Sequence, residues 1–287
     1  MVCIQVQIGL KSFFLSFALV AIVAFVQIYY SIIHFWINVL MFSAAGVIDF
    51  VLVKVFFRRY FPFQIAVRAA FLGYVFALGI FVKLVVPSHI QIFGSYICVM
   101  SFFHFSEFIA IGLVQPKFVS TDSFVLNHSP QYIAAAVSSW VEFFVEYYFF
   151  PVIAISGMKQ FYWVSNIGLG ICVLGELLRK TAMLTAGSNF NHLVQCEKFS
   201  NHTLVTYGVY GWFRHPSYVG WFYWSIGTQI LLLNPLCVPA YALASWLFFK
   251  TRIEIEEITL LNFFGQNYCD YQEKVWTGIP FIYGYRI

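Results

Sequence analysis

The chain contains several apolar stretches that are each long enough to cross a membrane as a helix. A hydrocarbon core about 30 Å thick needs roughly 20 apolar residues per helix. Eight stretches meet this length, at residues 12–30, 32–57, 65–86, 90–114, 131–155, 161–183, 217–233 and 236 to about 258. A soluble domain of 287 residues could not bury this much apolar surface, because 61% of the residues are hydrophobic and only 10% are charged. The bilayer must therefore be part of the solvent.

The predicted fold is an all-α, polytopic integral membrane protein. The apolar stretches are continuous, whereas the strands of a membrane barrel alternate apolar and polar residues. Helices also satisfy their own backbone hydrogen bonds in lipid. We expect a single membrane domain over 1–287, with six helices in 1–183. A catalytic region that faces the cytoplasm follows in 184–287 and comprises a polar loop, the last helical hairpin and a C-terminal segment.

The distribution of lysine and arginine predicts the orientation, because short cytoplasmic loops carry an excess of both. With a cytoplasmic N-terminus, nearly all loop cations fall in or near cytoplasmic segments, and Lys159 alone falls in a far-side loop. Both termini are then cytoplasmic. The net charge of +4 includes no basic run, so no nucleic-acid partner is expected. The six cysteines lack C-x-x-C spacing, which indicates neither a zinc site nor a disulfide framework.

The segment from Thr185 to Pro216 is too long for a helical hairpin and too polar to cross lipid. Loops of this length are often functional. The polar and aromatic residues in it are Asn189, Asn191, His192, Gln195, His202, Thr203, Tyr207, Tyr210, Arg214 and His215. A helix is expected to begin at Pro216, a residue that suits the first helical position. The free N–H groups of its first turn can hold a carboxylate.

A second polar cluster lies where the last predicted helix leaves the membrane. Arg252 and Glu256 are four residues apart there, so they lie on one face of the helix. Asn234-Pro235 reverses the chain between the last two helices, which brings this cluster back to the membrane face where the preceding helix begins. We therefore expect Arg214, His215, Arg252 and Glu256 to converge.

These residues carry a resemblance to a known family. The run HTLVTYGVYGWFRHPSYVGWFYWSIGTQILLLNP, then Arg252-x-x-x-Glu256, FFG at 263–265 and GIPF at 278–281, resembles the animal-type isoprenylcysteine carboxyl methyltransferases. The resemblance is specific over about Asn189 to Phe281. It implies methyl transfer from S-adenosylmethionine to the C-terminal α-carboxylate of a farnesylated or geranylgeranylated cysteine. This is the last step of CaaX processing, and its second product is S-adenosylhomocysteine.

The resemblance also implies roles for individual residues. It assigns the cofactor to Gln195, His202, Thr203, Leu204, Val205, Tyr210, His215, Pro216, Ser217, Tyr218 and Glu256. Arg252 is the candidate for the substrate carboxylate, because a guanidinium fork matches carboxylate geometry and stays charged. Arg214 has two interpretations: it binds the cofactor carboxylate, or it holds the loop by pairing with a nearby acid. Glu254 and Glu257 match the family pattern less well and are not expected in the site.

His215 is expected to hold a ligand by hydrogen bonding rather than to move a proton. An α-carboxylate has an ordinary pKa of about 3.3 to 3.7, so it is already ionised at neutral pH and needs no base. The resemblance further implies residence in the endoplasmic reticulum membrane with a cytoplasmic active site. The implied partners are membrane lipid and C-terminally prenylated proteins, such as Ras-like GTPases and lamin-type CaaX proteins.

Two other enzyme classes share the R-H-P-[SN]-Y core: membrane NADPH-dependent sterol reductases and phospholipid N-methyltransferases. The Arg252-x-x-x-Glu256 pair argues against the reductase. A receptor or channel without enzymatic activity would explain the helices but not the polar loop joined to a charged helix end.

Four acids, Glu107, Glu142, Glu146 and Glu176, lie within predicted helices. Intramembrane acids often mark functional sites, and interhelical hydrogen bonding is the other interpretation. No Glu-x-x-His pattern is present, so no metal is expected. The glycines at 168, 170 and 175 lack the strand and helix of a dinucleotide-binding fingerprint, which indicates close helix packing instead.

Overall fold

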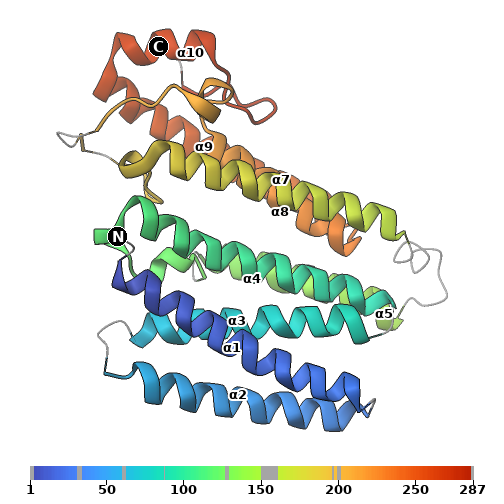
Figure 1. Ribbon diagram of the computed structural model, residues 1–287. Coiled ribbons are helices and arrows are strands. Elements are labelled where there is room, and N and C mark those ends of the chain that lie inside the picture. Colours follow the sequence, from blue (N-terminus) through green and yellow to red (C-terminus); the bar gives the residue numbers. More distant parts are fainter. Residues whose placement is uncertain are drawn as a thin grey trace. The chain divides into compact units, whose positions relative to one another are not determined.

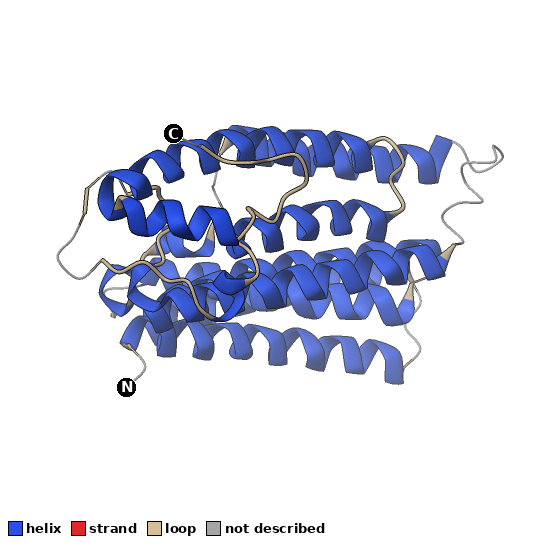
Figure 2. Ribbon diagram, turned by 90° about the horizontal axis from the view of Figure 1, so that it is seen from above, coloured by secondary structure: helices blue, strands red, loops and turns tan. Residues whose placement is uncertain are grey.

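The computed structural model describes residues 3–30, 34–59, 63–86, 88–126, 129–149, 161–195, 197–198 and 202–285. Throughout these residues the regular structure is helical (Figures 1 and 2). The chain divides into two compact units, Met1–Ile133 and Ala134–Ile287. The predicted division into 1–183 and 184–287 concerns function rather than packing and remains a prediction.

The first unit contains four long helices and two short turns of 3₁₀-helix. They are α1 (Ile4–Tyr29), α2 (Phe35–Phe57), α3 (Phe63–Val85), α4 (Ser88–Val114), η1 (Pro116–Phe118) and η2 (Thr121–Phe124). By length and composition each of α1 to α4 could cross a membrane. The first predicted span began too late: α1 starts at Ile4 rather than at residue 12. Val6 and Ile8 are buried, and their packing keeps this end helical.

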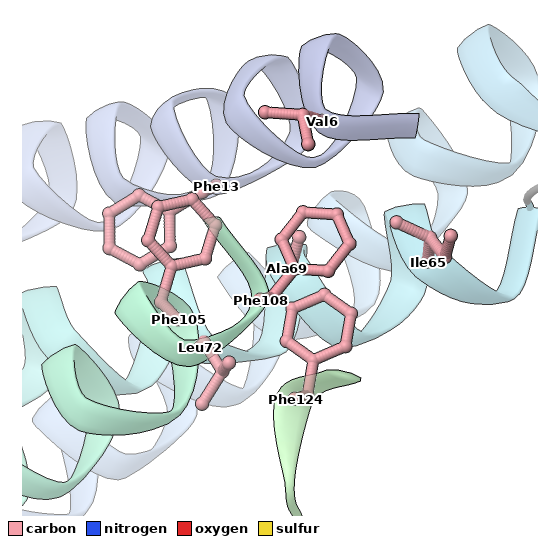
Figure 3. Close-up of a cluster of buried hydrophobic side chains, with 8 residues drawn as sticks. All are labelled: Val6, Phe13, Ile65, Ala69, Leu72, Phe105, Phe108 and Phe124. Carbon is pink, nitrogen blue, oxygen red and sulfur yellow. The ribbon is translucent and has the colours of Figure 1, made fainter. Parts of the chain in front are cut away.

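One hydrophobic cluster in the first unit contains two stacked pairs of aromatic rings (Figure 3). Its buried members are Val6, Phe13, Ile65, Ala69, Leu72, Phe105, Phe108 and Phe124. Phe13 stacks on Phe105 with ring centroids 4.0 Å apart, and Phe108 stacks on Phe124 at 4.2 Å. Because Phe124 belongs to η2, this stacking fixes the segment after α4 against the helices.

The second unit contains most of α5 (Pro130–Phe149), then α7 (Tyr162–Ala186), α8 (Pro216–Leu232), α9 (Cys237–Phe264) and α10 (Gln266–Lys274). Two short 3₁₀ turns, η3 (Gly187–Asn189) and η4 (Gly208–Gly211), lie in the loop between α7 and α8. The four longer helices match the last four predicted spans, although residues 150–155 of the span 131–155 lie outside the described residues. The last predicted span ended too early, since α9 continues to Phe264. The short helix α10 was not predicted.

Glycines allow α7 and α8 to pack backbone against backbone. A Cβ atom on Gly220 would lie 2.5 Å from the carbonyl oxygen of Gly175, and one on Gly168 would lie 2.2 Å from the amide nitrogen of Leu231. Real Cβ contacts are not this short, so only glycine fits there. The predicted packing role is confirmed for Gly168 and Gly175. It is wrong for Gly170, which would have open space around a Cβ atom.

The four acids singled out in the predicted helices differ in their surroundings. Glu142 of α5 accepts hydrogen bonds from the backbone N–H groups of Leu236 and Cys237, both at 2.7 Å, so it caps the start of α9. A carboxylate is favoured at a helix N-terminus. Glu176 lies 3.0 Å from Lys180 on α7, and Glu107 and Glu146 are buried. Interhelical hydrogen bonding is thus confirmed for Glu142. Among the described residues, no group of three side chains is arranged to hold a metal ion.

Gly220→Ala should lower the free energy of unfolding, by about 1–3 kcal/mol, because the added methyl overpacks the α7–α8 contact. Gly170→Ala is the matched control, since it adds the same methyl to open space, and helix propensity should make it neutral or slightly stabilising. Thermal unfolding in detergent micelles measures both. Equal midpoints for the two variants would contradict the packing account.

Candidate functional site

An open cavity of about 110 Å³ lies in the second unit, between the loop after α7, the start of α8 and the end of α9. The residues that line it are Ala186, Asn189, Phe190, Asn191, His202, Thr203, Leu204, Val205, Tyr210, Arg214, His215, Pro216, Ser217, Tyr218, Glu256, Leu260, Phe264, Tyr268 and Tyr271. The cavity therefore collects side chains from positions up to 85 residues apart in the chain.

Most of the residues predicted for the cofactor line this cavity. They are His202, Thr203, Leu204, Val205, Tyr210, His215, Pro216, Ser217, Tyr218 and Glu256, together with Arg214. Gln195 and Arg252 are not in the lining. The side-chain amide of Gln195 donates to the carbonyl of Leu193 at 3.2 Å. Arg252 contacts the cavity indirectly, through Tyr218.

The two residues before α8 pair with the C-terminal segment. The backbone N–H of Arg214 donates to the carbonyl of Trp276 at 2.9 Å, and that of His215 donates to the carbonyl of Thr277 at 3.4 Å. Helix α8 then begins at Pro216, which has no N–H group to leave unsatisfied. This pairing fixes where the first turn of α8 starts.

Arg214 and Glu257 form a buried ion pair at the centre of this region. The Nε of Arg214 donates to Oε1 of Glu257 at 2.8 Å, and the two side chains are 1% and 0% exposed. The remaining guanidinium nitrogens donate to the carbonyls of Gln272, Val275 and Tyr283. Of the two predicted interpretations of Arg214, this geometry matches the one in which it pairs with a nearby acid.

Glu257 also binds α10, the residue before α8 and the C-terminal segment. Its Oε1 also accepts from the hydroxyl of Tyr268 and lies 3.1 Å from Nε2 of His215. Its Oε2 accepts from the side chain of Gln272 at 3.1 Å and from the backbone N–H of Tyr285 at 2.7 Å. A Cβ atom on Gly284, whose φ is +77°, would lie 1.8 Å from Oε2, so the chain passes the carboxylate where only glycine fits. This structural role of Glu257 was not predicted from the sequence.

A second set of contacts joins Tyr218, Arg252 and Glu256. The hydroxyl of Tyr218 donates to Oε2 of Glu256 at 2.5 Å and accepts from Nε of Arg252 at 2.9 Å. The Nη2 of Arg252 donates to the carbonyl of His192. The ring of His215 stacks parallel to that of Tyr218, with ring centroids 5.6 Å apart. The Nδ1 of His215 lies 3.9 Å from Oε2 of Glu256. The structure thus brings the predicted site residues His215, Tyr218, Arg252 and Glu256 together.

The loop after α7 lies across the end of α9. The side chain of Asn189 accepts from the backbone N–H of Thr203 at 2.9 Å, and Lys198 donates to the carbonyl of Phe263. His202 contacts the rings of Phe263 and Phe264 edge-on. Burial, followed by the nearby charge of Lys198, lowers the pKa of His202 against the opposing effect of Glu256. The ring is therefore mainly neutral at pH 7, and its buried Nδ1 has no hydrogen-bond partner among the described residues.

Arg179 is a further buried cation beside the cavity, and no sequence pattern predicted a role for it in the site. Its side chain is on α7 and is almost fully buried. Its Nη1 donates to the hydroxyl of Ser217 at 2.7 Å, and its guanidinium lies 4.6 Å from the centre of the Trp221 ring. Arg179 therefore holds the first turn of α8, and Ser217 within it, against α7.

Comparisons with known proteins agree on one family. The profile described as the isoprenylcysteine carboxyl methyltransferase (ICMT) family matches residues 168–262. The protein-S-isoprenylcysteine O-methyltransferase of Tribolium castaneum is 63% identical over 98% of this chain and 98% of its own length. The Homo sapiens protein of the same name is 54% identical over 78% of this chain and 77% of its own. A solved structure of the eukaryotic intramembrane Ras methyltransferase ICMT superposes with a TM-score of 0.95 at 62% identity, covering 99% of this chain and all of the solved chain.

Glu257→Gln should lower the free energy of unfolding by about 3–5 kcal/mol, because it leaves the charge of Arg214 buried without a counter-charge. Glu254→Gln is the matched control: it makes the same chemical change one turn earlier on α9, where the side chain is partly exposed. Its effect should stay within about 0.5 kcal/mol. Thermal unfolding in the same detergent compares them. Similar midpoints for the two variants would show that the ion pair is not essential.

Proposed function

This chain belongs to the isoprenylcysteine carboxyl methyltransferase family, and from that premise we propose that its cavity binds S-adenosylmethionine beside the C-terminal carboxylate of a prenylated cysteine. The enzyme is a membrane-embedded methyltransferase that methylates the carboxyl group of isoprenylated cysteine in proteins. The observation that carries the proposal is the placement of Arg252. It reaches the cavity lining through the hydroxyl of Tyr218, which also binds Glu256.

The substrate carboxylate needs to be positioned rather than activated. Its ordinary pKa of about 3.3 to 3.7 leaves it ionised at neutral pH. Holding two reactants in line can supply much of the rate acceleration of an enzyme. No general base is therefore needed, which agrees with the hydrogen bond that His215 makes to the buried Glu257.

Arg252 has the donors required to hold that carboxylate. Its Nε and Nη2 are used by Tyr218 and by the carbonyl of His192. Its Nη1 has no hydrogen-bond partner among the described residues. Two N–H groups on this nitrogen are thus available for one carboxylate oxygen, and the other oxygen stays free to attack the methyl group. The contacts to Tyr218 and His192 keep the guanidinium oriented.

The residues of the cavity fit S-adenosylmethionine. The carboxylate of Glu256 can pair with the ammonium of the methionine part. The Nδ1 of His202, which has no hydrogen-bond partner in the described part of the chain, offers a polar contact in the lining. Tyr210 or Tyr218 can face a sulfonium through its ring. When bound, S-adenosylmethionine supplies an electrophilic methyl group and leaves as S-adenosylhomocysteine. Gln195, outside the lining, would need a shift of its loop to reach it.

Family membership separates this function from the other two enzyme classes that share the R-H-P-[SN]-Y core. Neither a sterol reductase nor a phospholipid methyltransferase needs an arginine placed to hold a carboxylate. The proposed assignment therefore gives Arg252 a function, binding the substrate carboxylate, that the two alternatives do not require.

We place the enzyme in the endoplasmic reticulum membrane with eight spans, both termini in the cytoplasm, and the catalytic region of 184–287 on the cytoplasmic side. The excess of lysine and arginine in the proposed cytoplasmic loops supports this orientation. Ras-like GTPases and lamin-type CaaX proteins are the proposed substrates. A prenyl chain contributes up to about 0.8 kcal/mol per buried CH₂ group, so the peptide before the cysteine needs few contacts.

Purified enzyme should transfer the labelled methyl group of S-adenosylmethionine to N-acetyl-S-farnesylcysteine and form a base-labile methyl ester. The same compound without its prenyl chain should accept little label, because most of the binding energy is lost with that chain. Release of volatile methanol on treatment with base measures the product. Cofactor binding without any methyl ester would contradict the proposed substrate.

Arg252→Ala should reduce methyl transfer by about 30-fold or more, because truncating a charge-assisted contact costs about 2 kcal/mol or more. Binding of S-adenosylhomocysteine should remain close to that of the wild type, since Arg252 is outside the cavity lining. Lys250→Ala is the control, because this cation on the same helix lies over the ring of Trp246 instead. Equal loss of transfer and of S-adenosylhomocysteine binding in Arg252→Ala would contradict the division of roles.

A further inference from the structure

The C-terminal segment 275–285 does not leave the protein after α10 but runs back along the helices of the hairpin (Figure 2). A Cβ atom on Gly278 would lie 2.3 Å from the side chain of Val219, one turn into α8. Farther on, the carbonyl of Pro280 accepts from the indole N–H of Trp246 at 2.7 Å. Trp246 lies eleven positions before Glu257, or about 16 Å along α9 at 1.5 Å per residue. The segment therefore extends along α9 from the level of Glu257 to the level of Trp246, well away from the site.

The backbone of this segment is bound to the protein, as a non-helical chain at membrane depth requires. Donors reach the carbonyls at 275, 276, 277, 279, 280, 282, 283 and 285. Three of these donors are N–H groups of Arg214, from its backbone and its guanidinium. The hydroxyl of Thr277 donates to the carbonyl of Ile282 and closes the loop on itself. The segment can thus enter lipid with most of its carbonyls already hydrogen-bonded.

The side chains of the segment divide into a buried and an exposed set. Ile279 and Ile282 are buried against Val219 of α8 and Ile253 of α9. The side chain of Phe281, at the tip, is 83% exposed. This division leaves a large apolar ring facing outward beside the middle of two apolar helices.

The exposed aromatic residues follow the order expected for a chain that dips into a bilayer. Trp276 and Tyr283, on the two legs of the loop, are exposed and have a polar group on each ring. Tryptophan and tyrosine are enriched at the membrane–water interface. Phe281, which has no polar group, lies between them at the tip. The chemistry of the three rings therefore matches increasing depth from the legs to the tip.

We propose that residues 275–285 form a re-entrant loop whose tip, Phe281, contacts the acyl chains of the surrounding lipid. The proposal rests on the membrane crossing of α8 and α9 that is part of the proposed function. Helix α8 has 17 residues and is about 25 Å long, shorter than the hydrocarbon core. Both of its ends must therefore lie near the membrane surfaces, and a loop that reaches the level of Trp246 lies within the hydrocarbon.

The same ion pair holds both legs of the loop. Arg214 binds the carbonyls of Val275 and Tyr283, and Glu257 accepts from the backbone N–H of Tyr285. The inserted tip and the start of α8 are thus parts of one hydrogen-bonded structure. Insertion of the tip would set the depth of the site relative to the lipid surface.

Collision measurements on nitroxide spin labels test the proposal. Phe281→Cys is labelled in the full-length enzyme and reconstituted into phosphatidylcholine vesicles, and signal from labelled native cysteines is measured on the parent protein and subtracted. Leu247→Cys, next to Trp246 on α9, reports hydrocarbon at the same depth, and Glu273→Cys, at an exposed position of α10, reports water. Both control side chains are solvent-accessible in the second unit. Accessibility to oxygen and to the water-soluble complex nickel ethylenediaminediacetate is compared.

The ratio of oxygen to nickel accessibility at position 281 should match that at 247 and exceed that at 273 several-fold. A ratio at 281 equal to that at 273, with 247 still oxygen-rich, would overturn the loop proposal and leave the membrane crossing intact. Low ratios at both 281 and 247 would overturn the crossing as well. Retained methyl transfer shows that a labelled variant is folded. If Phe281→Cys loses activity, Tyr283→Cys on the returning leg replaces it and should give an intermediate ratio.

Discussion

The buried ion pair between Arg214 and Glu257 is the interaction on which the structure around the cavity depends. Burying two charges is costly unless hydrogen bonds satisfy their remaining donors and acceptors. Here the partners are the carbonyls of α10 and of the C-terminal segment, the hydroxyl of Tyr268 and the backbone N–H of Tyr285. The pair therefore joins the start of α8, the end of α9, α10 and the C-terminus. Removing either charge would leave the other buried without a counter-charge.

Neighbouring glutamates take separate tasks because successive residues of a helix point about 100° apart. Glu257 points into the protein and binds Arg214, whereas Glu256 points toward the cavity and binds the hydroxyl of Tyr218. Arg252, one turn before Glu256, shares its face and reaches the same hydroxyl. One tyrosine thus lies between the carboxylate proposed for the cofactor and the guanidinium proposed for the substrate. This arrangement allows a small cavity to position two reactants with few charged groups.

The helices and most cavity residues could be predicted from sequence, while the groups that hold them could not. Long apolar stretches have few other folds available, and the Arg252-x-x-x-Glu256 spacing determines a shared helix face. The partner of Arg214 lies 43 positions away, next to another glutamate, and no local pattern separates the two. Arg179 was missed for the same reason, since it meets Ser217 only through the close packing of α7 on α8. The start of α1 and the existence of α10 depend on tertiary burial, which a hydropathy pattern does not contain.

The central claim is that the cavity beside the start of α8 binds the cofactor and that Glu256 supplies its negative charge. Calorimetric titration of S-adenosylhomocysteine into wild type and Glu256→Gln tests it most directly. Hydrogen bonds to charged groups contribute about 1.5–3 kcal/mol, so the variant should bind about 10- to 100-fold more weakly. Its unfolding midpoint without ligand should be unchanged, because Glu256 is partly exposed and the ion pair below it is intact. Wild-type affinity in Glu256→Gln would contradict the account.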